Sequence, residues 1–289
     1  MADIKSLLAC PACQIPLPQD LRCPACGTQY GQKYGVFDIV SPKLSGNQEI
    51  LWRITDEAIE AADEPQSAEN QANQAVQDEL TRDYAAKLNQ ESQEAERVAA
   101  TNFYRRLYQL PLKGLVCDLA TGMGGMLRTL LGVQREFDIV CTDIDRRMLA
   151  WTRKQINTDD DRVSYVATDG RHLAFVDNTF DCVTSFAAFG NIPQGDKVAR
   201  ELYRALKPGG KLLFRENLVD EDSASFAQGR EWGLENGITE RTLTAGLKAA
   251  GFKKITVTTA AKAIWVENPF DRLPVAGDMN YYCIVKAVK

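Results

Sequence analysis

Three aspartates stand where apolar runs of the chain end, and their spacing is the first sign of chemistry. Asp118 follows the run GLVC, Asp143 follows FDIVCT and Asp169 follows VSYVAT. The loop TGMGGM comes soon after the first aspartate and leads into a helix-like segment. Glycines let a backbone approach a ligand closely, and the start of a helix offers unpaired N–H groups. If the runs are parallel strands, the three carboxylates lie at the sheet edge where open α/β sheets bind ligands.

Together these aspartates predict an adenosine-binding edge. A carboxylate at Asp143 can accept hydrogen bonds from both hydroxyls of a ribose, and Asp169, with the Gly170 backbone beside it, can accept from an exocyclic amine. One strand-end aspartate alone more often forms a turn or a helix cap, so the set of three carries the prediction. The dinucleotide fingerprint requires glycine at its sixth position, where this chain has Leu127. The loop therefore does not favour NAD.

Four cysteines near the start form a second candidate site. The stretch CPACQIPLPQDLRCPACG holds two C-x2-C pairs separated by nine residues. Four thiolates so arranged can surround one tetrahedral zinc ion and leave no open position, which favours a structural over a catalytic metal. A redox C-x2-C motif belongs at a helix start after a strand, and here the two copies pair with each other instead. The predicted ligands are Cys10, Cys13, Cys23 and Cys26.

Alternating strand and helix patterns must position the aspartates. The apolar runs GLVCDLA, FDIVCTD, VSYVATD, FDCVTSFAAF and GKLLFREN are interspersed with GGMLRTLLG, RRMLAWTRKQI and DKVARELYRAL. Continuous apolar strands separated by helices are typical of a parallel sheet covered on both faces. Residues 109–289 are therefore predicted to form a doubly wound α/β domain, completed by the helix ITERTLTAGLKAAG and the strands KKITVTT and NYYCIVKAV.

Two further segments precede this domain. Residues 1–43 are the predicted zinc ribbon, and 44–108 a helical connecting segment. Residues 47–100 hold 13 acidic and 4 basic side chains, a net charge of −9, so the rest of the chain sums to +4 against the total of −5. The total charge therefore neither favours nor excludes a nucleic-acid partner. The segment can form a lid over the site, pack on the sheet edge or remain a solvated linker. One predicted helix face holds Val76, Leu80, Tyr84 and Leu88.

Cysteine usage and hydropathy bear on the compartment. No apolar run approaches the roughly 18 residues that span a bilayer, and MADIKSLLA lacks the features of a signal peptide. The sequence predicts a cytoplasmic protein without membrane insertion, whose thiols are metal ligands or buried small hydrophobes. The cysteines expected in the core are Cys117, Cys141, Cys182 and Cys283.

Residues 105–289 resemble the class I S-adenosylmethionine-dependent methyltransferases, most closely the menaquinone-type C-methyltransferase branch with its type 11 methyltransferase domain. The family's cofactor motif, acid-x-Gly-x-Gly-x-Gly, stands here as DLATGMG, with Ala120 in place of the first glycine. DGRHLAFVDNTFDCVTSFAAF matches the family's loop and fourth strand, and RALKPGGKLLF its helix, turn and fifth strand. The resemblance implies a Rossmann-like, seven-stranded sheet with S-adenosylmethionine as cofactor. It places cofactor contacts at Asp118, Ala120, Gly122, Gly124, Asp143, Ile144, Asp169, Gly170 and Phe186.

The mechanism implied by the resemblance is direct displacement. A sulfonium is already a strong electrophile, so the protein mainly aligns the acceptor with the methyl carbon and excludes water. A base is needed only where the acceptor carries a proton that must leave. The candidates are Asn191 in FGNIP and Glu216 at the end of the fifth strand, although residues of these types at such places more often form caps or turns. His172, the only histidine, could be a base, but it follows Asp169 by three residues, which favours the loop beside the adenine.

The ribbon bears on the acceptor. With YGQKYGVFDIVSP after it, the ribbon resembles the small zinc-ribbon activators of tRNA and protein methyltransferases, and also the zinc module of rRNA guanine-N1 methyltransferases, whose fourth ligand is His rather than Cys. GNIP lacks the second proline and the aromatic residue of the motif that holds exocyclic base amines, and no Lys/Arg cluster with interleaved aromatics is visible. A small-molecule acceptor is therefore favoured. The alternatives are an rRNA or tRNA base reached through the ribbon, and a non-catalytic protein that binds the cofactor or a protein partner.

Overall fold

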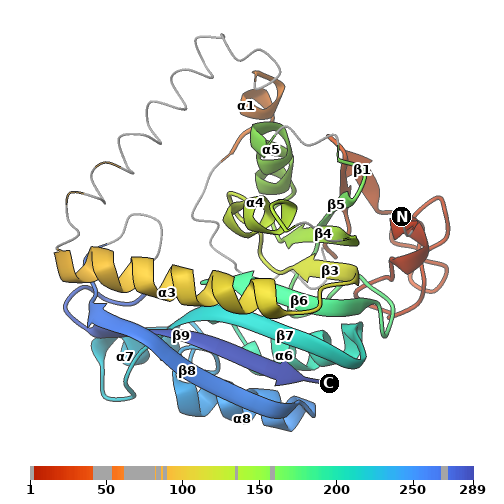
Figure 1. The fold of residues 1–289 in the computed structure, drawn as a ribbon. Helices are drawn as coiled ribbons and strands as arrows, with labels where there is room; N and C mark the ends of the chain where they lie inside the picture. Colours follow the sequence, from red (N-terminus) through yellow and green to blue (C-terminus); the bar gives the residue numbers. More distant parts are fainter. Residues whose placement is uncertain are drawn as a thin grey trace.

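A nine-stranded sheet forms the centre of the molecule, which is a computed structural model that describes residues 3–41, 54–61, 82, 86, 90–133, 136–156, 160–267 and 273–289. The strand order is β1-β2-β5-β4-β3-β6-β7-β9-β8 (Figure 1). The strands are β1 (Gly31–Lys33), β2 (Val36–Asp38), β3 (Gly114–Asp118), β4 (Phe137–Asp143), β5 (Val163–Ala167), β6 (Phe180–Phe186), β7 (Leu206–Leu218), β8 (Lys253–Ile264) and β9 (Met279–Val288). Strands β2 to β7 are mutually parallel, whereas β9 is antiparallel to both of its neighbours. The predicted seven-stranded α/β sheet is confirmed as β5 to β8 in this order, and two strands from the ribbon extend it.

Helices cover both faces of this sheet. In Figure 1 helices α1, α3, α4 and α5 lie above it, and α6 and α8 lie below it. The helices are α1 (Asp56–Ala61), α3 (Gln90–Gln109), α4 (Gly125–Leu131), α5 (Arg146–Ile156), α6 (Gly195–Ala205), α7 (Ala224–Glu231) and α8 (Glu240–Ala250), with short 3-10 turns η1 (Ile4–Leu7) and η2 (Phe189–Asn191). None of the described helices has both the length and the apolar character needed to cross a membrane.

Spacing in the sequence explains why these helices pack where they do. Val198, Leu202 and Ala205 recur at intervals of three and four along α6, so they share the face that is buried against the sheet. Thr239 caps α8 by accepting a hydrogen bond from the Thr242 N–H, and Gly251 ends the helix with a φ of 108°. The four cysteines expected in the core, Cys117, Cys141, Cys182 and Cys283, are buried.

The ribbon is built into the sheet. Strand β2 pairs in parallel with β5, with Val36 opposite Tyr165. A loop, residues 168–179, connects β5 to β6 where a helix is usual in such folds. The ribbon forms backbone hydrogen bonds to this loop. The Ala9 N–H donates to the Ala174 carbonyl and the Val176 N–H to the Leu7 carbonyl, both at 3.0 Å. The ribbon's apolar side chains belong to the same hydrophobic core as this loop.

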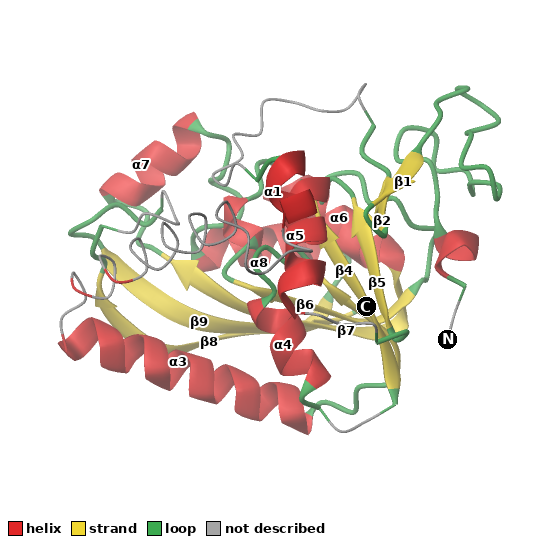
Figure 2. Ribbon diagram, turned by 90° about the horizontal axis from the view of Figure 1, so that it is seen from above, coloured by secondary structure: helices red, strands yellow, loops and turns green. Residues whose placement is uncertain are grey.

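The connecting segment packs against the sheet where it is described. Figure 2 shows α3 along β8 and β9 at one end of the sheet, with β1 at the other end. Ala95, Ala99, Phe103 and Leu107 form the buried stripe of α3. Within the predicted helical connecting segment, 44–108, the described residues include the helices α1 and α3. The predicted face of Val76, Leu80, Tyr84 and Leu88 lies outside the described residues.

Candidate active site

The three strand-end aspartates lie on adjacent strands. Asp118 ends β3, Asp143 ends β4 and Asp169 follows β5, and these strands are neighbours in the sheet. Because the strands are parallel, the structure places the three carboxyl-bearing residues at one edge. Ile144 follows Asp143 at the same edge and is half-buried.

Asp118 is the most confined of the three. Its side chain is 1% exposed, and neither carboxyl oxygen has a hydrogen-bond partner among the described residues. Burial raises the pKa of Asp118 to about 8. A buried carboxyl group without partners is costly, so its two oxygens suit a ligand that brings hydrogen-bond donors. The donor-rich amino acid end of S-adenosylmethionine fits this requirement.

The glycine loop is tied to Asp143. The Gly122 N–H donates to Asp143 Oδ2 at 3.0 Å, and Thr152 Oγ1 donates to the Gly122 carbonyl at 2.6 Å. Asp143 Oδ1 accepts from the Asp145 N–H at 3.1 Å. Each carboxylate oxygen keeps further acceptor capacity, which fits a pair of ribose hydroxyls. Burial raises the pKa of Asp143 to about 6.

Backbone conformation explains two of the small residues in this loop. Gly124 has a φ of 79°, and a Cβ atom there would collide with Ile156 and Thr152 of α5. Ala120, where the family has glycine, has a φ of 52°. An L-residue in this region costs about 1–2 kcal/mol, so the alanine carries backbone strain at the cofactor edge.

Replacing Gly124 by alanine is expected to destabilise the protein by about 2–4 kcal/mol, because it adds left-handed strain to a steric clash. Gly125→Ala is the matched control, since a Cβ at Gly125 meets nothing within 4 Å and the residue begins α4. Urea unfolding monitored by circular dichroism measures the difference. Equal unfolding midpoints for the two variants would contradict the loop geometry.

Asp169 differs from the expectation of an open carboxylate. Its oxygens accept from the Arg171 backbone N–H at 2.9 Å and from Nε and Nη2 of the same arginine at 2.6–3.1 Å. The Arg171 guanidinium therefore shares the Asp169 carboxylate with any further donor. Gly170 lies beside this pair, and a Cβ there would be 3.1 Å from Ile192 Cδ1. The His172 N–H donates to the Asp169 carbonyl, and burial lowers the pKa of the His172 ring.

Phe186, at the end of β6, is enclosed by aromatic residues of α3. Its ring stacks with Tyr104 at a centroid distance of 6.2 Å and meets Phe103 edge-on at 5.6 Å. Helix α3, which belongs to the connecting segment, therefore contacts Phe186 at the end of β6, where the cofactor is expected.

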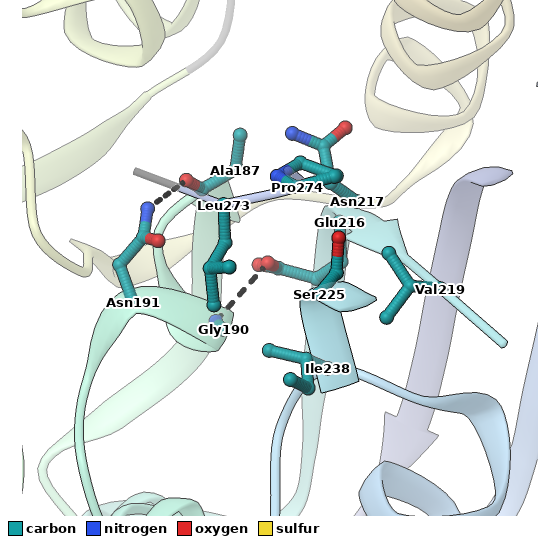
Figure 3. A pocket seen from close by; sticks show the side chains of 10 residues that line it. All are labelled: Ala187, Gly190, Asn191, Glu216, Asn217, Val219, Ser225, Ile238, Leu273 and Pro274. Atoms are coloured by element: carbon teal, nitrogen blue, oxygen red, sulfur yellow. Dashed lines mark hydrogen bonds between the residues drawn. The ribbon is translucent and has the colours of Figure 1, made fainter. Parts of the chain in front are cut away.

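Both catalytic candidates line one pocket (Figure 3), which lies after β6 and β7. The Glu216 carboxyl group is 1% exposed and accepts from the Phe189 and Gly190 N–H groups at 3.2 and 3.3 Å. Burial raises the pKa of Glu216 to about 7. Asn191 is exposed and donates to the Ala187 carbonyl at 3.1 Å. The space between the lining side chains is narrow, about 20 Å³.

Sequence reasoning missed other polar residues around this pocket. Asn217 lines it directly, and the buried Arg215 donates to the Asn217 side chain. The signal was present in the run LLFREN, where three consecutive polar residues follow an apolar strand. Ser225 also lines the pocket, but its hydroxyl donates to Asp278 and accepts from the Val275 N–H.

The four ribbon cysteines converge. Their sulfur atoms all lie within 4.8 Å of one another, and the Cys10 and Cys26 sulfurs are 3.8 Å apart. Tetrahedral zinc with bonds of about 2.3 Å requires sulfurs about 3.8 Å apart, so the set fits this ion. Gln14 and Gly27, each following a C-x2-C pair, both have positive φ values, which gives the two pairs similar turns.

Comparisons with known proteins agree with this geometry. A family described as "Methyltransferase domain" matches residues 117–214. The ubiquinone/menaquinone biosynthesis C-methyltransferase UbiE of Yersinia enterocolitica is 30% identical over 179 residues, covering 52% of this chain and 70% of that protein. UbiE of Escherichia coli is 38% identical over 104 residues, 35% of this chain and 41% of its own length.

Among solved structures, the fold resembles phosphoethanolamine N-methyltransferase 2 of Haemonchus contortus in complex with S-adenosyl-L-methionine. The TM-score is 0.51 at 22% identity, over 65% of this chain and 52% of that chain. With the fold, the aspartate edge and these relatives in agreement, the chain belongs to the class I S-adenosylmethionine-dependent methyltransferases.

Proposed function

We propose that this enzyme methylates a small molecule at carbon, with Glu216 as the base that takes the acceptor's proton. The observation that carries the proposal is a buried carboxyl group with a pKa near 7 in a pocket beside the cofactor edge. A base with a pKa near the working pH is the most effective proton acceptor. The loop that follows β6 lies between the two sites, since it starts after Phe186 and supplies Ala187 and Asn191 to the pocket.

The cofactor's share of the chemistry is an activated methyl group whose bond to sulfur breaks with the electron pair remaining on sulfur. Asp143 would hold the ribose, and Asp118 would meet the donors of the amino acid end. The positive-φ glycine loop lets the backbone approach closely. Gly170, Ile144 and Phe186 complete the proposed cofactor contacts, with Asp169 holding Arg171 beside them.

Glu216 would then act on the acceptor. As the new bond to the methyl carbon forms, the acceptor loses a proton to the Glu216 carboxylate, so the acceptor leaves uncharged after it gains a methyl group. The N–H groups of Phe189 and Gly190 hold the carboxylate in place. Asn191, at the mouth of the same pocket, is proposed to orient the acceptor.

Carbon as the target is supported by the relatives, which are named C-methyltransferases. A small molecule is supported by the charge pairing near the ribbon. Lys33, Arg146 and Arg147 all contact Asp56 of α1, at 2.7, 3.2 and 3.2 Å, so these cations are already paired with an acid. The zinc is proposed to be structural, and the cytoplasm remains the compartment predicted from cysteine usage.

The proposed cofactor binding is tested by calorimetric titration with S-adenosylhomocysteine. One site per chain is expected, and Asp143→Ala should weaken binding by at least about tenfold, because it removes charge-assisted hydrogen bonds. Asp161→Ala, a change at an exposed turn, is the control. Failure of the wild-type chain to bind would refute the proposed function.

Asp118→Asn is expected to stabilise the ligand-free enzyme and weaken cofactor binding. Because the folded-state pKa of Asp118 is raised from 3.8 to about 8, the folded protein keeps a proton that the unfolded chain loses. Stability therefore falls as the pH rises through this range. An amide does not titrate, so the Asp118→Asn variant should not lose stability in this way. At pH 8 its melting temperature should exceed that of the wild type by on the order of 5 °C. A lower melting temperature with unchanged affinity for S-adenosylhomocysteine would contradict this account.

A further inference from the structure

A second pocket lies at the edge of the sheet opposite to the three aspartates. It is lined by residues that precede or begin β3, β6 and β7, among them Lys113, Asp181 and Lys211. These strands are mutually parallel, so their first residues meet at one edge and their last residues at the other. The volume of about 380 Å³ is within the usual range of small-molecule sites. The proposed cofactor and acceptor contacts make no use of this pocket.

Three lysines and one acid supply the charge of this pocket. The acid, Asp181, is already engaged, since its Oδ2 accepts from Lys207 Nζ at 2.5 Å and from the Leu115 N–H at 3.0 Å. Lys113 and Lys211 also line the pocket, and neither has an ion-pair partner among the described residues. Two of the described lining residues therefore carry positive charge that no acid balances.

Two more cations lie beside Lys211. On β9, Lys286 pairs with Leu213 of β7, which is two residues after Lys211, so the two lysines lie on the same face of the sheet. Burial lowers the pKa of Lys286, and the charges of Arg106 and Lys211 lower it further. All three cations are half-buried. Like charges held together in this way repel one another, and a bound anion would relieve the repulsion.

We infer that this pocket, named here the lysine pocket after Lys113, Lys207 and Lys211, is a second ligand site that binds an oligophosphate group, free or carried by a nucleotide. Several negative charges on one ligand match several unbalanced cations on the protein. A lysine ammonium is a compact charge that commonly binds phosphate, whereas the arginine fork suits planar carboxylates, and the described lining contains no arginine. The inference does not depend on the acceptor or on Glu216.

The shape and composition of the lysine pocket favour a small ligand over a nucleic-acid strand. The turn KPGG at 207–210 forms part of the wall, and it is fixed because the Gly209 N–H donates to the Lys289 carbonyl at 3.1 Å. Leu110, Pro111 and Pro208 provide apolar wall for the rest of a ligand. A groove for single-stranded nucleic acid combines cations with aromatic side chains on which bases stack, and the described lining has no aromatic residue.

Calorimetric titration of the full chain with inorganic pyrophosphate tests this inference. One site per chain is expected, with an affinity that falls as the NaCl concentration rises, because salt screens the attraction. Lys113→Ala combined with Lys211→Ala should weaken binding by at least about tenfold, since two charge-assisted contacts are lost. ADP and adenosine distinguish the two sources of the ligand. Tighter binding of ADP than of pyrophosphate assigns a nucleotide, and weaker binding assigns a free oligophosphate, with adenosine not bound at this site in either case.

The matched control is Lys248→Ala combined with Lys262→Ala. It also removes two positive charges, from exposed lysines of α8 and β8 that do not line the pocket. This variant should bind pyrophosphate as the wild type does. Both double variants should keep the wild-type affinity for S-adenosylhomocysteine, which shows that they fold and keeps this test separate from that of the proposed function.

Four results would overturn the inference. The first is no binding of pyrophosphate by a wild-type chain that binds S-adenosylhomocysteine, and the second is equal binding by the wild type and the Lys113→Ala, Lys211→Ala variant. The third is displacement of pyrophosphate by S-adenosylhomocysteine, which would place the anion at the cofactor edge. The fourth is a single-stranded RNA that binds more tightly than pyrophosphate and loses its binding in the same double variant, which would make this surface a nucleic-acid site.

Discussion

Glu216→Gln is expected to lower the rate of methyl transfer by about 10²- to 10⁴-fold, the usual contribution of a general base. The amide has nearly the same shape and still offers an oxygen to the Phe189 and Gly190 N–H groups, but it cannot take a proton. The affinity for S-adenosylhomocysteine should stay within about twofold, because Glu216 lies in the acceptor pocket. Radiolabelled methyl transfer and calorimetry measure the two quantities.

The pH dependence of the methyl-transfer rate tests the role of Glu216 a second time. The base works as the carboxylate, and the pKa of Glu216 is about 7, so the wild-type rate should rise with pH and level off above 7. The Glu216→Gln variant should lack this rise. Glu231→Gln, at an exposed position of α7, should match wild type in both rate and profile. A Glu216→Gln enzyme that keeps half of the wild-type rate would remove Glu216 from the mechanism.

Loss of the ribbon metal is expected to weaken cofactor binding as well as folding. The proposed zinc would hold the turns around the cysteines, and two backbone hydrogen bonds join this part of the chain to the loop that follows Asp169. Cys26→Ser should reduce the zinc content well below one ion per chain and raise the Kd for S-adenosylhomocysteine by about tenfold, the effect of losing about 1.4 kcal/mol of binding free energy.

Cys26→His is the matched control for this change, because an imidazole can replace one thiolate in a Cys3His zinc site. It should keep most of the metal and most of the affinity. Metal analysis and calorimetry on both variants decide the outcome. If Cys26→Ser loses its zinc and still binds S-adenosylhomocysteine with wild-type affinity, the ribbon does not support the cofactor edge.

The parallel sheet and the aspartate edge were predictable because their signals are local. Each of β3, β4 and β5 is a continuous apolar run that ends in or is closely followed by an aspartate, and parallel pairing then brings the three residues to one edge. The four-cysteine cluster was predictable for a similar reason, since the spacing of the cysteines is visible without knowing the fold.

The ribbon's place in the sheet could not be predicted in this way. Strands β1 and β2 have three residues each, too few to show a period, and the partner of β2 is more than a hundred residues away along the chain. The Arg171 contact with Asp169 was also hidden, because it depends on how one turn folds back on its own carboxylate.

The acceptor pocket depends on pairing between distant strands. Arg215, Glu216 and Asn217 are consecutive, and only the register of β7 decides which face each side chain takes. Strand β9 lies between β7 and β8, and it brings Tyr282 to Arg215 and Asn280 to Asn217. No local pattern in the sequence reports this neighbourhood.

The most direct measurement incubates the purified chain with S-adenosylmethionine labelled in its methyl group and a cell extract divided into small-molecule, RNA and protein fractions. The account predicts label in the small-molecule fraction, bound to carbon, and almost none with the Glu216→Gln variant. Label confined to the RNA or protein fraction, or equal labelling by the two enzymes, would contradict it.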